Sequence, residues 1–466
     1  MTRNSFSTIT WAFLTLAFLT VSGCNNEPAF EVESYVEGTL SIRAEVDSGA
    51  DFSGFRVSVL TRIEGDVDTL GTAVTTASGA FAMNVRAHVS GVFPMVVERS
   101  GTVLSVNDFV VSNGDSARVN GSYPLNPSGL RIISSENVAW SAYRNAKAGH
   151  NQQMLEMLRS EAYVPEDIGR ITAQTSTVLW SIPAAYPSTI GGELAMAESI
   201  VMMEGWNDST VAQRLPLLSL KNNSLVEVVS AARRSIARLA GQDSALAMLD
   251  YYLAVSPEER HPGIMAEKII AYADSFQNSL AVQTATLLKK RYPTSEWSAW
   301  AARATYELEN LQPGMNAPAF SEVSRKGADL STAGFKGKFL ILEFFNPSEP
   351  VFQREFADRD NIAAALDPRM FITISLSVEP DSVVNEALFD GDSHAGYFVW
   401  LPMGMDSKIV SDFNVQILPT RYLIDPSGQI VRKYSGPGIV ALEEDLASIV
   451  TGLNGITKVP VLKKIN

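Results

Sequence analysis

The sequence predicts a multidomain chain with an N-terminal all-β sandwich, a central α-helical region and a C-terminal α/β domain. Apolar residues alternate with polar ones through the first part and recur at helical spacing through the middle. In the last part, apolar runs of strand length alternate with helical segments. With 466 residues, 46% of them hydrophobic and 19% charged, the chain can bury several cores.

The first 23 residues have the composition of a signal peptide. The apolar run WAFLTLAFLTV is shorter than a membrane span, which needs about 20 residues. It ends in Val21-Ser22-Gly23-Cys24, which resembles a bacterial lipobox. The resemblance implies cleavage before Cys24 and acylation of its sulfur. We therefore expect a lipoprotein signal peptide over 1–23 and a lipidated tether over 24–29; a conventional signal peptide with a chance cysteine is the alternative.

Anchoring through Cys24 would place the protein in the bacterial cell envelope, with its body in the periplasm or at the cell surface. A net charge of −14 disfavours nucleic acid as a partner. No cofactor is expected. The histidines lie far apart in the sequence, so no metal site is expected either; they are His88, His150, His261 and His394.

The pattern of residues 30–125 predicts short β-strands. Leu40 and Ile42 alternate with polar residues, as do Phe81, Met83 and Val85. Turn signals separate such runs, which indicates a small β-sandwich. This region resembles the carboxypeptidase-regulatory or prealbumin-like modules of envelope lipoproteins, which implies a binding or spacing role.

Residues 130–311 have helical periodicity. One apolar stripe consists of Val228, Val229, Ala232, Ile236 and Leu239. The paired helices resemble a tetratricopeptide-type array. No clean 34-residue repeat is visible, so an irregular bundle is the alternative. In either case the region is expected to be a spacer or a docking surface.

Residues 313–455 contain a buried-strand run, Phe339–Phe345, and later the segment Pro419-Thr420-Arg421-Tyr422-Leu423-Ile424-Asp425. The turn Asp425-Pro426-Ser427-Gly428 predicts a hairpin at the edge of a sheet. This region resembles the thioredoxin-like superfamily, in its TlpA and AhpC/TSA-related envelope branch. The resemblance implies an α/β thioredoxin fold, with residues 456–466 as a tail.

Active members of that superfamily carry a Trp-Cys-x-x-Cys motif at a helix N-terminus. Alignment to the motif puts Glu349 on the first cysteine and Phe352 on the second, with Pro350 between them. Because thiol–disulfide exchange requires two sulfur atoms, we expect no dithiol chemistry here. The Glu349 carboxylate would still suit a helix N-terminus.

The resemblance implies two further site positions. Glu343 falls on the buried acid that exchanges protons with the active cysteine; solvent exposure or a salt bridge is the alternative for this glutamate. Pro419, preceded by Leu418, matches the family's cis-proline. It either shapes a loop or borders a groove that binds extended polypeptide by β-augmentation.

Three functions follow from these observations. The favoured one is a membrane-anchored envelope lipoprotein that binds or scaffolds a protein or peptide partner and is not an enzyme. A carboxylate-based enzyme is the second, although acids along a helix more often form its solvated face. The third is a thiol-disulfide oxidoreductase or peroxiredoxin relative in redox homeostasis that borrows thiols. The acids considered for the second are Glu343, Glu349, Glu355, Asp358 and Asp360.

Overall fold

The computed structural model describes residues 31–452, except 48, 50, 64, 126–128, 161–162 and 390–393. The predicted signal peptide, the tether with Cys24 and the tail at 456–466 lie outside these residues. The chain forms two compact units, Met1–Trp206 and Asn207–Asn466. It contains several sheets and many helices, as the sequence predicts, and the boundary between the units falls inside the predicted helical region.

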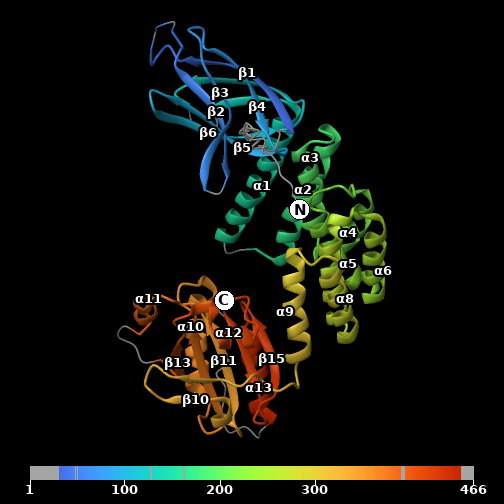
Figure 1. Cartoon of the computed structure of the whole chain (residues 1–466), viewed down its shortest axis with the longest axis vertical. Coiled ribbons are helices and arrows are strands. Elements are labelled where there is room, and N and C mark those ends of the chain that lie inside the picture. Colours follow the sequence, from blue (N-terminus) through green and yellow to red (C-terminus); the bar gives the residue numbers. More distant parts are fainter. Residues whose placement is uncertain are drawn as a thin grey trace, which may run out of the picture. The chain divides into compact units, whose positions relative to one another are not determined.

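The strands of the first unit form two four-stranded sheets (Figure 1). Their orders are β4-β1-β7-β8 and β3-β2-β5-β6, and every pairing is antiparallel except that of β1 with β7. Phe81, Met83 and Val85 of one sheet share a core with Val57 and Val59 of the other. The strands are β1 (Val32–Ile42), β2 (Phe55–Ile63), β3 (Asp66–Val74), β4 (Ala80–Ala87), β5 (Gly91–Arg99), β6 (Thr102–Val111), β7 (Ser116–Tyr123) and β8 (Leu130–Ile133).

Three helices complete the first unit: α1 (Ser135–Ser160), α2 (Pro165–Ala185) and α3 (Ile190–Val201). Side chains of α1 tie it to β6. The Asn137 Oδ1 accepts a hydrogen bond from the Val110 N–H at 2.9 Å, and the Trp140 Nε1 donates to Asp108 at 3.1 Å. These bonds fix α1 against β6 within the first unit.

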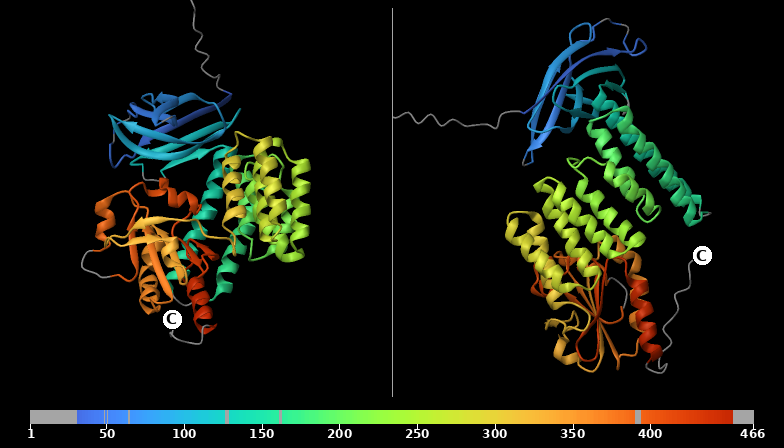
Figure 2. Two further views of the ribbon diagram at one scale, coloured as in Figure 1. Left: turned by 60° about the horizontal axis from the view of Figure 1, so that its bottom comes forward. Right: turned by 90° about the vertical axis from the view of Figure 1, so that its right-hand side faces the viewer.

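The helices of the second unit recur at a nearly constant interval. Of the helices after Trp206, α4, α6 and α8 begin 34 and 36 residues apart, and α5, α7 and α9 begin 36 and 35 residues apart. Consecutive helices pack side by side, as the green and yellow part of Figure 2 shows. The interval is close to the 34 residues of a tetratricopeptide repeat. The helices are α4 (Asp208–Arg214), α5 (Leu225–Ala240), α6 (Gln242–Val255), α7 (His261–Asp274), α8 (Asn278–Arg291) and α9 (Glu296–Asn310), with short 3-10 turns η1 (Leu215–Leu217) and η2 (Glu258–Arg260).

The rest of the second unit is an α/β domain built on a five-stranded sheet of order β13-β12-β11-β14-β15. Strands β11, β12 and β13 are parallel, and β14 and β15 add an antiparallel hairpin at the edge, as its turn residues predict. A separate hairpin, β9 (Ser321–Val323) and β10 (Asp329–Ser331), precedes this sheet. The sheet strands are β11 (Phe339–Phe345), β12 (Phe371–Ser377), β13 (Tyr397–Trp400), β14 (Thr420–Ile424) and β15 (Ile430–Ser435).

Helices cover both faces of this sheet. On one face, Leu342 and Phe344 of β11 share a core with Phe413, which follows α12. On the other face, Ile341 packs with residues of α10 and α13. Glu343 alternates with Leu342 and Phe344 along β11, so it lies on the second face. The helices of this domain are η3 (Thr332–Phe335), α10 (Pro350–Ala365), α11 (Ser382–Ala387), η4 (Gly404–Asp406), α12 (Lys408–Asp412) and α13 (Ile439–Gly452).

Candidate functional site

The N-terminus of α10 follows the central strand β11 through a short turn. Glu349 is the N-cap of this helix, and its Oε1 accepts a hydrogen bond from the Val351 N–H at 3.3 Å. Pro350 occupies the first helical position, where its missing N–H costs nothing. The carboxylate therefore lies at the helix N-terminus, as the sequence predicts, and acts there as a cap.

The turn between β11 and α10 is held by its own side chains. The Asn346 Oδ1 accepts a hydrogen bond from the Ser348 N–H at 2.8 Å, and the Asn346 Nδ2 donates to Glu379 at 3.0 Å. The Gln353 Nε2 donates to the Pro347 carbonyl at 3.0 Å. These bonds fix the turn that the sequence alignment placed on the Trp-Cys-x-x-Cys motif.

Phe352, which the sequence alignment placed on the second cysteine, is part of an aromatic core. Its side chain is 1% exposed, and its ring stacks on Phe345 with centroids 4.2 Å apart. Phe356 and Phe398 complete the surroundings of these two rings. A resolving thiol would have to reach the first sulfur, whereas this position is filled by the packed phenylalanine ring.

Glu343 is 1% exposed and lies between two arginines. Its Oε1 is 2.8 Å from the Arg421 Nε, and its Oε2 is 3.3 Å from the Arg359 Nε. The Ser375 hydroxyl donates to the same Oε2 at 2.6 Å. The alternative of solvent exposure is wrong because β11 is a central strand covered on both faces; the alternative of a salt bridge is confirmed.

These partners fix the charge of Glu343. Burial alone would raise its pKa, but the positive charges of Arg421 and Arg359 and the hydrogen bond from Ser375 outweigh burial and lower it. Both guanidinium groups keep their protons at any pH that proteins tolerate. A carboxylate with a lowered pKa is a weak base, so Glu343 is poorly suited to take a proton from a thiol.

Two of the five acids considered for carboxylate catalysis meet at Arg421. The Glu355 Oε2 lies 2.7 Å from the Arg421 Nη1, and the Glu343 Oε1 lies 2.8 Å from the Arg421 Nε. Asp360 pairs with Arg359 at 3.2 Å, and Glu349 caps α10. The cavity beside this cluster has a volume of about 10 Å³, enough for roughly one water molecule and no substrate.

The Leu418–Pro419 peptide bond is cis, so the cis-proline predicted from the sequence is confirmed. The Pro419 carbonyl accepts from the Gly436 N–H at 2.8 Å, and the Ile417 carbonyl accepts from the Thr420 hydroxyl at 2.6 Å. The backbone N–H and C=O of Leu418 have no hydrogen-bond partner among the described residues. Ile417 is 57% exposed, so this segment borders solvent.

Sequence reasoning missed the two arginines that hold Glu343. The available signal was a charged residue inside an apolar strand: Arg421 precedes Tyr422, Leu423 and Ile424, all buried. A buried arginine requires an anionic partner, and Glu343 stands in an equally apolar strand.

The histidines are engaged in separate places. The His150 Nδ1 lies 3.1 Å from the Thr175 hydroxyl, and the His261 Nδ1 lies 3.2 Å from the Tyr292 hydroxyl. Within the described ranges, no three His, Cys, Asp or Glu side chains gather as a metal site requires. Over the same ranges, none of the helices is both long and apolar enough to cross a bilayer.

No protein-family model matches the chain, and no curated protein matches it. Solved structures that resemble it are thioredoxin-like thiol-disulfide oxidoreductases. The thioredoxin domain of a thiol-disulfide oxidoreductase from Bacteroides vulgatus is 22% identical over 29% of this chain and 99% of its own, with a TM-score of 0.27.

Two further structures are similar over the same share of the chain. A thiol-disulfide oxidoreductase from Bacteroides fragilis is 22% identical over 28% of this chain and 98% of its own, with a TM-score of 0.25. An exposed lipoprotein thioredoxin from Streptococcus pneumoniae is 20% identical over 28% of this chain and 99% of its own, with a TM-score of 0.25. The likeness concerns the fold of less than a third of the chain, and the strand order described above stands without it.

Proposed function

We propose that this protein is a membrane-anchored envelope lipoprotein whose thioredoxin-like domain binds extended polypeptide and performs no redox chemistry. The observation that carries the proposal is the backbone of Leu418, beside the cis-proline, which lacks hydrogen-bond partners among the described residues. An extended chain can pair with such a backbone as an added strand does.

The lack of redox chemistry rests on three side chains. Of the two residues that the sequence alignment placed on the thiols, Glu349 is a helix cap and Phe352 is buried core. Glu343 is bound by two arginines and is a weak base. The same contacts argue against a carboxylate enzyme, because the converging acids are already neutralised.

Exposed apolar side chains support a binding role for the end of the sheet where the parallel strands finish and where Leu418 leads into β14. Trp400 is 38% exposed and Met403 is 67% exposed, at and just after the carboxyl end of β13. The Trp400 indole donates to the Glu379 carbonyl, and Glu379 accepts from Asn346 of the turn before α10. Exposed tryptophan and methionine adapt well to polypeptide partners.

The anchor and the other parts of the chain complete the proposal. Cys24 would carry the lipid, as the lipobox resemblance implies, and the sandwich and the helical array would space and dock the α/β domain. A protein partner in the envelope is therefore the proposed ligand, and no nucleic acid is expected.

Site-specific photocrosslinking in cells tests the binding surface. A benzophenone amino acid at Ile417 is compared with the same group at Val440 on α13, because both native side chains are 57% exposed. We expect a discrete set of crosslinked proteins from position 417 that position 440 does not give. Equal products from both positions, or none from position 417, would overturn the proposed groove.

The absence of redox activity has its own test. The full chain is expected to reduce insulin with dithiothreitol or glutathione no faster than a control without protein. Catalytic reduction above that control would refute the redox-inactive role and leave the crosslinking result unaffected.

A further inference from the structure

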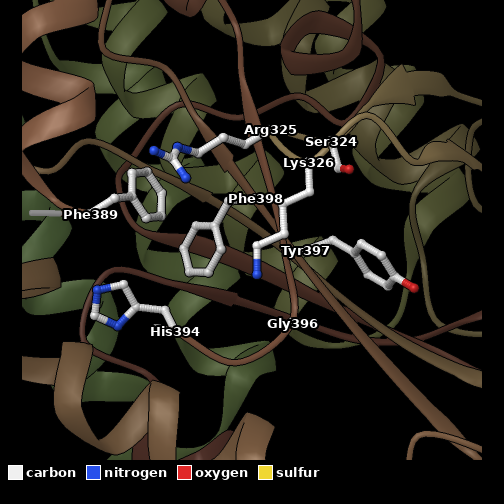
Figure 3. A pocket seen from close by; sticks show the side chains of 8 residues that line it. All are labelled: Ser324, Arg325, Lys326, Phe389, His394, Gly396, Tyr397 and Phe398. Carbon is white, nitrogen blue, oxygen red and sulfur yellow. The ribbon is translucent and has the colours of Figure 1, made fainter. Parts of the chain in front are cut away.

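A second cavity in the α/β domain lies beside β13, at the tip of the β9–β10 hairpin (Figure 3). Its volume is about 210 Å³, smaller than the roughly 300–1,000 Å³ of pockets for drug-sized ligands. The Leu418 segment does not line it. Its lining residues are Ser324, Arg325, Lys326, Phe389, His394, Gly396, Tyr397 and Phe398.

The hairpin tip is held rigidly against the edge strand. The Gly327 N–H donates to the Ser324 carbonyl at 2.8 Å, and the Ala328 N–H donates to the Ser324 hydroxyl at 2.9 Å. The Arg325 N–H donates to the Phe398 carbonyl of β13 at 2.7 Å. Two consecutive basic residues are therefore presented over β13 before any ligand arrives.

The floor of the cavity is apolar and fixed. The centroids of the Phe398 and Phe389 rings are 5.1 Å apart, and the rings meet at an interplanar angle of 82°. The Arg359 guanidinium lies 4.5 Å from the centroid of Phe398. Gly396 has φ +88°, and a Cβ there would come within 2.8 Å of the Thr373 carbonyl oxygen. A side chain at position 396 is thereby excluded, and the floor keeps its shape.

The two basic residues of the tip differ in their partners. The Arg325 Nη2 lies 2.7 Å from Glu386, and its guanidinium lies 4.4 Å from the Phe389 centroid. Lys326 forms no ion pair with another described residue, and its ammonium ends between Phe398 and Tyr397 (Figure 3). Among the described residues that line the cavity, Lys326 is thus an exposed cation without an ion-pair partner, and it lies above an aromatic floor.

We propose that this cavity binds a small monocarboxylate with an apolar or aromatic body. The carboxylate pairs with the Lys326 ammonium, and the body lies on Phe398 and Phe389. The ammonium of Lys326, unpaired among the described residues, matches one negative charge, and a charge-assisted hydrogen bond is stronger than a neutral one. A free acid and the C-terminal residue of a peptide share this chemistry.

Isothermal titration calorimetry on the full chain tests the site. The ligands are 3-phenylpropionate and its neutral amide, and Gly-Gly-Phe with a free or an amidated C-terminus. The variants are Lys326→Met and, as control, Lys336→Met, which removes an equal charge from an exposed loop that does not line the cavity. We expect at least one of the acids to bind about tenfold more tightly than its amide.

Lys326→Met is expected to abolish that preference, and Lys336→Met to keep it. Binding of the free acid alone identifies a small-molecule ligand, whereas tighter binding of the peptide acid identifies a C-terminus. Absence of saturable binding by either acid, equal binding of acid and amide, or an unaltered preference in Lys326→Met would each overturn the site. None of these results depends on the groove at Leu418.

Discussion

The Arg421 Nε lies 2.8 Å from the Glu343 Oε1, and both side chains are 1% exposed. Arg421 belongs to β14 and Glu343 to β11, and the two residues are paired in the antiparallel register of these strands. An ion pair so deeply buried exists only where each charge has its partner, because an isolated buried charge is very costly. Arg421 also binds Glu355 of α10, so one side chain links β14, β11 and α10.

Removing this arginine is expected to destabilise the α/β domain strongly. Arg421→Met leaves Glu355 without a cation and Glu343 with only Arg359, at an expected cost of about 3–5 kcal/mol in the free energy of unfolding. Urea denaturation measures this change. Arg432→Met is the control, because it breaks an ion pair between Arg432 and Asp445 with side chains 53% and 33% exposed. That pair contributes less than about 1 kcal/mol, and similar losses in both variants would contradict the network.

The pH dependence of stability should reveal Glu343. Its pKa in the folded state is lowered: burial opposes the shift, and the charges of Arg421 and Arg359 outweigh it. The stabilisation from Glu343 is therefore fully present above the ordinary glutamate pKa of about 4.3 and is lost as the pH falls toward the lower, folded value.

Comparison with Glu343→Gln isolates this contribution. The wild-type free energy of unfolding is expected to fall more steeply than that of the variant between about pH 5 and pH 3. The variant is also expected to be less stable at pH 7, because both arginines lose their shared anion. Parallel pH profiles from urea denaturation would show that Glu343 has no lowered pKa.

The sequence predicted the features that depend on local residue types. The turn at Asp425 follows from a few adjacent residues, whereas the cis bond before Pro419 was implied by the resemblance to the thioredoxin-like superfamily. The cluster around Glu343 could not be predicted, because Glu343 and Arg421 are 78 residues apart and meet only through strand register.

The helical interval also escaped sequence analysis. The helices of the second unit recur every 34–36 residues, while the residues at matching positions differ. Helix length and packing define this repeat, and neither requires a recurring motif. For example, Arg233 on α5 forms a 2.8 Å ion pair with Glu267 on α7, and this pair belongs to one position of the array without being a repeated motif.

The alignment of Glu349 and Phe352 with the two thiol positions can be tested directly. Residues at i and i+3 of a helix N-terminus have Cβ atoms about 5–6 Å apart, close enough for a disulfide after small adjustment. Glu349→Cys/Phe352→Cys is expected to lose both free thiols under oxidant, as measured by alkylation with and without reductant. Loss of the buried phenylalanine ring should cost about 3 kcal/mol of stability. A folded double variant that keeps two free thiols would contradict the alignment; Glu349→Cys alone is the control.

If Cys24 carries a lipid anchor, replacing it should move the protein from the membrane fraction of the cell to the soluble fraction. Cys24→Ser removes the acylation site and should move the protein from the membrane fraction to the soluble one, because each acyl methylene contributes about 0.8 kcal/mol of membrane binding. Asn26→Ser, two residues along the tether, should stay with the membrane. Mass spectrometry of the N-terminal peptide checks the modification, and a free Cys24 thiol in the wild-type protein would exclude the anchor.

The turn between α7 and α8 offers a prediction about backbone strain. Phe276 has φ +57° and is 92% exposed, and the Gln277 N–H donates to the Tyr272 carbonyl at 2.8 Å as in a helix C-cap. Glycine avoids the left-handed penalty of about 1–2 kcal/mol but loses more chain entropy on folding. Phe276→Gly should therefore stabilise the second unit by about 0.5–1 kcal/mol and raise its melting temperature by about 1–3 °C. Phe276→Ala keeps a Cβ in the left-handed conformation and should change the melting temperature little. A lower melting temperature for the glycine variant would show that the exposed ring stabilises this unit.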